Sequence, residues 1–122
     1  MYNKVMMIGK IVTAPELRHT PSGVPVTSFR IVVRRKYVRK GEGRKSDYFD
    51  VVCWHDDAEF VQKHFAKSDM IMVEGEMQTR ERTDKNGNRI KDSEIVADRV
   101  SFTSEKKSVD DEEAHLHKLD KK

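Results

Sequence analysis

Short apolar runs bounded by turn-forming residues recur along the first hundred positions of this chain. They are rich in β-branched and aromatic residues and in methionine, which is typical of strands. In one of them Phe29, Ile31 and Val33 alternate with other side chains, as in a strand with one buried face. The pattern predicts five strands, over residues 5–12, 24–34, 47–55, 70–81 and 89–102.

Residues 56–67 have a different period and predict the one helix. Ala58, Val61 and Phe65 form an apolar stripe at i, i+3 and i+7, which lies on one face of a helix. Asp56 or Asp57 is expected to cap the helix at its N-terminus.

Glycine and proline mark the connections. Gly9 and Gly75 lie inside predicted strands, where glycine often marks a bulge or a sharp bend of the kind that barrels need. The segment DKNGN at 84–88 is a strong hairpin signal because Asn-Gly accepts positive φ. Residues 13–23, with Pro15, Pro21 and Gly23, are expected to be a loop.

Five strands with a helix between the third and the fourth match the OB-fold, a partly open five-stranded Greek-key barrel. The fold class is therefore expected to be all-β, and another small α+β domain is the alternative. We expect one OB-fold domain over residues 1–103. Residues 104–122 are polar and lack periodicity, so a disordered, charged tail is expected there.

Composition adds three limits. The net charge of +3 and the pI of about 9.0 hint weakly at a polyanionic partner, and the tail carries five Lys against six Asp or Glu. The single cysteine, Cys53, allows no disulfide within the chain, which fits a reducing compartment. Neither a signal peptide nor a membrane span is recognisable, so a cytoplasmic protein without a membrane partner is expected.

The most basic stretch lies between the second and third predicted strands. Seven of the twelve residues from 34 to 45 are Lys or Arg, and Glu42 is the single acid among them. Tyr37 lies in its middle, and Tyr48 and Trp54 follow on the next strand. Spaced cations bind a phosphate backbone with release of counterions, and aromatic rings stack on unpaired bases. These residues predict a surface for single-stranded nucleic acid.

A purely structural interpretation of these residues stays open, because charged hairpins are commonly just solvated and a strand Tyr often packs against its cross-strand neighbour. Trp54 favours the functional interpretation. By period-two alternation it shares the polar face with Tyr48 and Asp50, opposite Phe49 and Cys53. A large indole ring on a polar face calls for a partner.

No catalytic constellation is recognisable. His55 precedes two aspartates, but at the start of a helix this combination is more often a cap than a metal site. His115 and His117 have no partner ligands at zinc spacing, and Cys53 has no activating neighbour. We expect no enzyme activity, no catalytic residues, no metal and no cofactor.

Several stretches taken together resemble the bacterial single-stranded DNA-binding protein family. They are NKVMMIGKIVTAPELRHTPSGVPVTSF (3–29), DYFDVVCWHDDAEFVQKHFAK (47–67), VEGEMQTRERTD (73–84) and EIVADRV (94–100). The resemblance covers residues 1–103 in order. It implies an OB-fold assembled as a homotetramer, a dimer of dimers, with ssDNA wrapped over it without marked sequence preference.

The resemblance also implies site residues. The family's stacking aromatics match Tyr37, Tyr48 and Trp54, and a further family aromatic matches Arg82, whose guanidinium can stack on a base. Basic positions of the family's surface match Lys4, Arg34, Lys67 and Arg80. Charge alone adds further phosphate-binding candidates, namely Arg30, Arg35, Lys36, Arg39, Lys40, Arg44 and Lys45.

Three positions depart from the family pattern. Lys67-Ser68-Asp69 replaces the usual Lys-Gly-Ser after the helix. Phe49 matches a histidine at a subunit interface. The chain has acidic residues at 110–113 but ends in Leu119-Asp120-Lys121-Lys122 instead of the usual tip with Pro-Phe, so partner recruitment through that tip is not expected.

The leading hypothesis is a protein that coats and protects ssDNA in DNA replication, recombination and repair. It would be cytoplasmic and nucleoid-associated, encoded by a bacterium, phage or plasmid. Two alternatives stay open: an OB-fold adaptor of a primosome, and an RNA-binding OB domain. A nuclease has no carboxylate cluster on the expected face to support it.

Overall fold

The computed structural model describes residues 1–37, 39–43 and 45–103, which hold six strands and one helix. The predicted tail from 104 lies outside the described residues. No helix among them is long and apolar enough to cross a membrane. The elements are β1 (Val5–Ile11), β2 (Glu16–His19), β3 (Pro25–Arg34), β4 (Ser46–Trp54), α1 (Asp56–His64), β5 (Met70–Thr83) and β6 (Arg89–Ser101).

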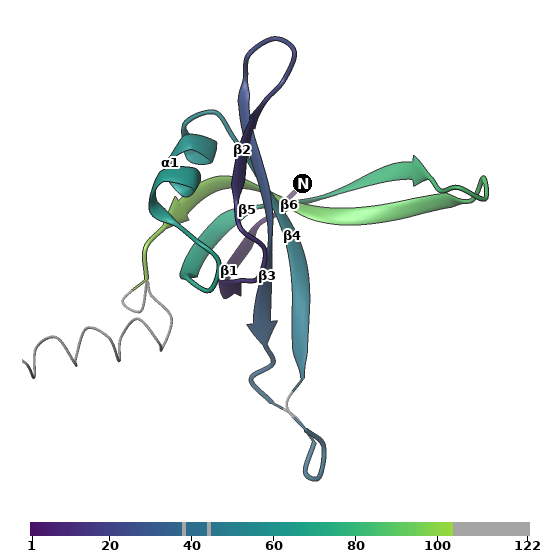
Figure 1. The fold of residues 1–122 in the computed structure, drawn as a ribbon. Coiled ribbons are helices and arrows are strands. Elements are labelled where there is room, and N and C mark those ends of the chain that lie inside the picture. The colour runs from purple at the N-terminus through teal and green to yellow at the C-terminus, as the bar shows by residue number, and fades with distance from the viewer. Residues whose placement is uncertain (38, 44, 104–122) are drawn as a thin grey trace, which may run out of the picture.

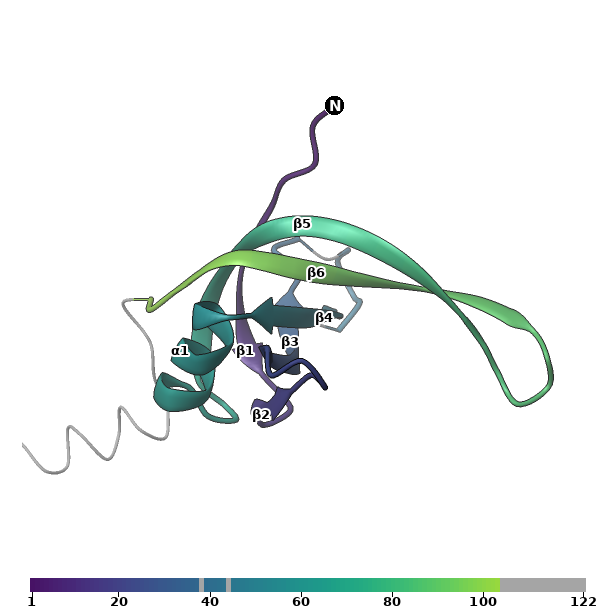
Figure 2. The same ribbon diagram turned by 90° about the horizontal axis from the view of Figure 1, so that it is seen from above.

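The strands close into a ring, as Figures 1 and 2 show from two sides. The order is β1-β5-β6-β4-β3-β2, and β1 also pairs with β3 through Lys10↔Val32 and Ile11↔Ile31. All pairings are antiparallel except β4 with β6. The ring consists of β1, β5, β6, β4 and β3, and β2 is attached to it at β3. Five strands closed in this way, with α1 between β4 and β5 in the chain, confirm the predicted mainly-β OB-fold.

The core fills this ring and extends under α1. Ile31, Ile71 and Ile95 are fully buried inside the barrel. The predicted helical stripe is confirmed, since Ala58, Val61 and Phe65 all belong to the same core. The helix therefore covers one end of the barrel (Figure 1).

The sequence prediction is wrong in two segments, the loop before β3 and the helix. The expected loop at 13–23 contains β2, which pairs with β3 from Glu16↔Ser28 to His19↔Pro25. This strand is four residues long and only its Leu17 packs against the core, so no apolar pattern marks it. The expected aspartate cap of α1 is also absent.

The start of α1 shows why the aspartates do not cap it. The N-cap residue is His55, which has φ 57°, and no side chain caps the helix. The sharp bend at His55 places Asp56 and Asp57 inside the first helical turn, where carboxylates complement the helix dipole. The helix ends at His64, three residues earlier than predicted.

Gly9 and Gly75 allow the ring to close. A Cβ at Gly9 would lie 2.8 Å from the carbonyl oxygen of Val32, because β3 comes close to β1 there. A Cβ at Gly75 would overlap the carbonyl group of Val96, at the register shift between Glu74 and Gly75. The predicted bends are therefore places of close backbone approach.

Two hairpins extend beyond the barrel as arms (Figure 1). We call residues 33–48 the β3–β4 arm and residues 79–93 the β5–β6 arm. The β4–β6 pairing covers only residues 50–52 of β4, so the two hairpins diverge on either side of it. The second arm ends in the predicted Asn-Gly turn, where Gly87 has φ 81° and Asp84 N donates to the carbonyl of Asn88.

We expect Gly75→Ala to destabilise the fold by about 1–3 kcal/mol or more, because the added methyl group has no room beside Val96. Gly43→Ala is the matched control, since its Cβ would meet nothing within 4 Å and its φ is ordinary. Urea unfolding of both variants measures the difference. Equal stabilities would show that this close approach does not constrain the barrel.

The thiol of Cys53 is fully buried, and burial raises its pKa to about 12, with a smaller contribution from the charge of Asp57. At pH 8 the native thiol is therefore protonated and shielded. We expect no reaction with a thiol-disulfide reagent in the folded protein and complete reaction in denaturant. Fast labelling under native conditions would contradict this placement of the β4 side chains.

Candidate nucleic-acid interface

Neighbouring residues of β3 and β4 make one continuous surface on the outside of the barrel. Antiparallel register pairs Trp54 with Val26, Asp50 with Arg30, and Tyr48 with Val32, so these side chains share one side of the sheet. We call this the outer face, and it comprises Val26, Ser28, Arg30, Val32 and Arg34 of β3 and Ser46, Tyr48, Asp50, Val52 and Trp54 of β4.

The exposure of the aromatic rings agrees with the predicted alternation. The Tyr48 residue is 61% exposed and Trp54 is 40% exposed, whereas Val51 and Cys53 between them face the core. Val52 also lies on the outer face but is buried. The two rings therefore lie along β4, with Asp50 and the buried Val52 between them.

The outer face continues onto β5 and β6. Asp50 pairs with Glu94 across the parallel β4–β6 ladder, and Arg80 pairs with Asp92 two residues further out. A shallow hollow of about 260 Å³ joins these strands, lined by Arg30, Asp50, Arg80 and Glu94 together with Thr13, Ser28, Phe29 and Val51. The structure thus brings Arg30 and Arg80 together, from segments fifty residues apart.

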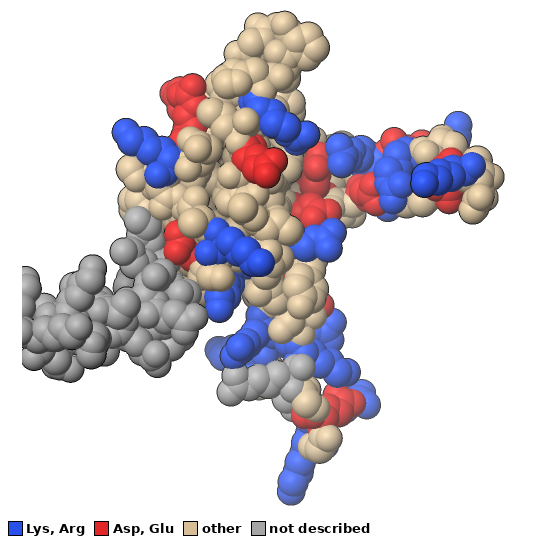
Figure 3. Space-filling view, viewed as in Figure 1, with Lys and Arg blue, Asp and Glu red and all other residues tan. Residues whose placement is uncertain are grey.

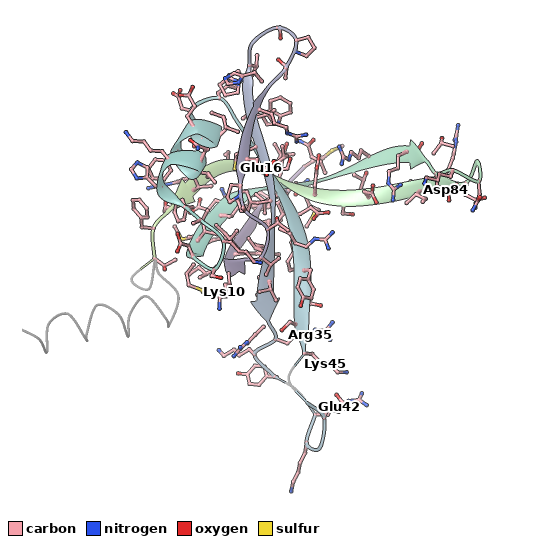
Figure 4. All side chains as sticks on the ribbon, viewed as in Figure 1. Lys10, Glu16, Arg35, Glu42, Lys45 and Asp84 are labelled. Atoms are coloured by element: carbon pink, nitrogen blue, oxygen red, sulfur yellow. The ribbon has the colours of Figure 1, made fainter. Side chains whose placement is uncertain are left out.

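The β3–β4 arm carries a second group of predicted residues. A hollow of about 440 Å³ is lined by Arg35, Tyr37, Arg39, Glu42 and Lys45. Tyr37 is 81% exposed, and Nζ of Lys36 lies 5.6 Å from the centre of its ring. The arm is dominated by blue in Figure 3, and Figure 4 labels Arg35, Lys45 and Glu42 on it.

Tyr37 does not continue the row of Tyr48 and Trp54. Its neighbour in the hollow, Arg35, is ion-paired with Asp47, and Asp47 pairs in register with Val33. Asp47 therefore points to the side of the sheet opposite Tyr48. The structure divides the predicted site between the outer face and the other side of the β3–β4 arm.

Carboxylates on neighbouring strands hold three of the predicted arginines. Arg35 donates from Nε and Nη2 to the two oxygens of Asp47, both at 2.9 Å. Arg30 donates from Nε to Asp50 at 2.9 Å, and Arg82 from Nε to Asp92 at 2.7 Å.

These contacts also shift the pKa values of the groups that make them. The hydrogen bond from Arg35 lowers the pKa of Asp47, and the positive charge adds a smaller effect in the same direction. The hydrogen bonds and charges of their aspartates raise the pKa of Arg30 and Arg35. Both arginines are therefore cations, and Asp47 is an anion, at neutral pH.

The remaining predicted cations lie apart or unpaired. Lys4 contacts Glu74 at 3.3 Å and Asp98 at 3.8 Å near the start of β1, and Lys45 contacts Glu42 at 3.1 Å. Lys67 follows α1 near the other end of β1, about 20 Å along that strand. Arg44 lies outside the described residues. No carboxylate of the described residues lies within 4.0 Å of Arg34, Lys36, Arg39, Lys40, Lys67 or Arg80.

Phe49 lies on the barrel side of β4. It is half-buried, packs against the core and, with Tyr48, Asp50, Met77 and Ser93, lines a hollow of about 380 Å³ where the two arms diverge. Within residues 1–37, 39–43 and 45–103, no three His, Cys, Asp or Glu side chains lie close enough to hold a metal ion.

Sequence reasoning missed the acidic partners of the site. Asp47 and Asp92, which pair with Arg35 and Arg82, are unremarkable in the sequence, and only the register of the sheet brings them to these arginines. The alternation around Asp50 was a usable signal, since it placed Asp50 on the face of Tyr48 and Trp54.

Comparison with known proteins gives a consistent result. A family model described as the single-strand binding protein family matches residues 2–103. A protein of Staphylococcus aureus called "Single-stranded DNA-binding protein 1" is 35% identical over 117 residues, which are 96% of this chain and 74% of the relative. "Single-stranded DNA-binding protein 2" of Listeria monocytogenes is 36% identical over 106 residues, 87% of this chain and 66% of the relative. A "Single-stranded DNA-binding protein" of Caldanaerobacter subterraneus is 39% identical over 106 residues, 87% of this chain and 71% of the relative.

Proposed function

The chain belongs to the single-strand binding protein family, and we propose that it binds single-stranded DNA without marked sequence preference and coats it during replication, recombination and repair. The observation that carries this proposal is the outer face. There Tyr48 and Trp54 are exposed on one strand, and the basic β3–β4 arm adjoins them.

Bases stack on Tyr48 and Trp54, and phosphates run along the cations of the two arms. Stacking tolerates any base because every base has a π face, so this arrangement needs no base-specific hydrogen bonds. Phosphate contacts come from Arg34, Arg39, Lys40 and Arg80. Arg82 lies two residues after Arg80 on the same face of β5. Lys36, Lys45 and Arg44 are assigned to the same role.

The single-stranded DNA must pass around the β3–β4 arm to contact all the stacking residues. Tyr48 lies on the outer face, whereas Tyr37 lines the hollow with Arg35 on the other side. An exposed two-stranded arm with cations on both sides suits such a path. Lys4 and Lys67, near the two ends of β1, belong to more distant parts of the path.

We also propose a homotetramer, a dimer of dimers. Met6 and Ile8 are 62% and 52% exposed on the outer side of β1, beside half-buried Met72 of β5. Among the described residues, β3 pairs with only Lys10 and Ile11 of β1 and lies close to Gly9, which leaves one edge of Val5–Ile8 open. An apolar, open strand edge supports association with another copy.

Further parts of the proposal follow from the family. The binding domain is residues 1–103, which the matched residues 2–103 support. The protein acts by binding alone, in the cytoplasm, with neither a metal nor a cofactor. The buried Cys53 thiol is not available as a nucleophile in the folded protein.

We expect Tyr48→Ala to weaken binding to an oligothymidylate about fivefold to more than a hundredfold, the equivalent of about 1–3 kcal/mol of lost stacking. Tyr48→Phe keeps the ring and is expected to bind like the parent. The quenching of Trp54, the only tryptophan, reports binding in both variants. Parent-like affinity of Tyr48→Ala would show that no base stacks on Tyr48.

We expect Ile8→Glu to lower the mass measured by light scattering, because a buried carboxylate at the β1 edge opposes association. Gln62→Glu on exposed α1 makes the same charge change and is expected to leave the mass unchanged. If both variants keep the mass of the parent, association does not use β1.

A further inference from the structure

We propose that Asp47 masks Arg35 from single-stranded DNA and thereby limits the affinity of the β3–β4 arm. This inference rests on the proposed function and names a residue that tunes it. It starts from the geometry of the three arginine–aspartate pairs, which are alike in chemistry but differ in how much of the guanidinium they occupy.

The Arg35–Asp47 pair occupies the edge of the guanidinium that a phosphate would use. Nε and Nη2 both donate to Asp47, one to each oxygen, at 2.9 Å. A phosphate binds a guanidinium best through two parallel hydrogen bonds of this kind. A phosphate that takes this edge of Arg35 must therefore displace the carboxylate.

The other two pairs occupy less of their guanidinium groups. Asp50 and Asp92 accept only from Nε of Arg30 and Arg82, at 2.9 and 2.7 Å. Their terminal nitrogens have no hydrogen bond to another described residue, and they can form a fork with a phosphate. Asp47 is thus expected to mask its arginine more than Asp50 or Asp92 does.

Arg35 lies where the loss of one available cation would weaken DNA binding. Its side chain is about half exposed and lines the hollow that also contains Tyr37, Arg39 and Lys45. A phosphate beside a base stacked on Tyr37 would lie among these cations. Asp47 adds a negative charge at that place, which repels the phosphate and cancels one of the charges that attract it.

Asp47 could instead serve to hold the Arg35 side chain in position, and its removal would then have the opposite effect on DNA binding. If the carboxylate mainly orients Arg35 for DNA, its removal weakens binding. Both side chains are substantially exposed, at 53% and 40%, and exposed pairs hold their side chains weakly. The loss of orientation is therefore expected to be smaller than the gain of an unopposed cation.

The test compares Asp47→Asn with the parent protein on an oligothymidylate, between about 50 and 200 mM salt. We expect several-fold tighter binding at the lowest salt and a slope of log K against log salt that is steeper by about 0.7, the value for one added phosphate contact on a single strand. Asp50→Asn and Asp92→Asn are expected to show smaller changes.

Two controls separate masking from a general charge effect. Glu81→Gln makes the same charge change on the β5–β6 arm, where Glu81 pairs in register with Lys91 on the side opposite Arg82, and it should leave the slope unchanged. In an Arg35→Gln background, Asp47→Asn should produce no gain, because the masked cation is gone. Thermal unfolding checks that each variant is folded.

Unchanged or weaker binding of a folded Asp47→Asn variant, or the same gain with and without Arg35, would overturn the masking role of Asp47. In either case the parent still binds ssDNA. Failure of the parent itself to bind oligothymidylate at low salt would instead overturn the proposed function.

Discussion

The double pairing of β1 is the constraint on which the rest of this structure depends. A seven-residue strand must form a ladder with β5 along most of its length and also reach β3 at Lys10 and Ile11. This is feasible because Gly9 and Gly75 lack a Cβ where neighbouring backbones approach. Closure uses only the inner part of each long hairpin, so the outer parts of β3–β4 and β5–β6 extend as arms.

The arms explain how so small a domain offers a long surface for a polyanion. Apart from Val33, which packs against the core at the base of the β3–β4 arm, both sides of the arms are available for charged and aromatic residues. The β3–β4 arm is strongly basic, whereas the β5–β6 arm mixes both signs (Figure 3). Carboxylates next to Arg30, Arg35 and Arg82 keep part of the charge neutralised within the chain. Affinity then depends on which cations are unpaired as well as on their number.

Particular residues show what the sequence could and could not predict. Alternation around Tyr48 and Trp54 placed both rings outside the barrel, and the apolar stripe placed α1 on the core, because burial imposes a period on local sequence. The edge strand β2 was missed because Leu17 alone packs inward. The cap of α1 was misjudged because His55 takes a positive φ that no pattern announces.

The pairing between residues on different strands also could not be predicted from the sequence. The side of the β3–β4 arm on which Tyr37 lies, and the partners of Arg35 and Arg82, depend on cross-strand register and on the turn of each hairpin. A one-residue change in register would move each side chain to the other face. Basic residues could be recognised as a group from the sequence, but their division into paired and unpaired cations required the fold.

The central claim is that ssDNA crosses the outer face and passes around the β3–β4 arm. Photochemical crosslinking of an oligothymidylate, followed by mass spectrometry of the peptides, tests it most directly. Crosslinks at Trp54 and Tyr48 on the outer face and at Tyr37 on the other side of the β3–β4 arm are the predicted result. Crosslinks confined to α1 and β2, with none on β4 or the β3–β4 arm, would contradict it.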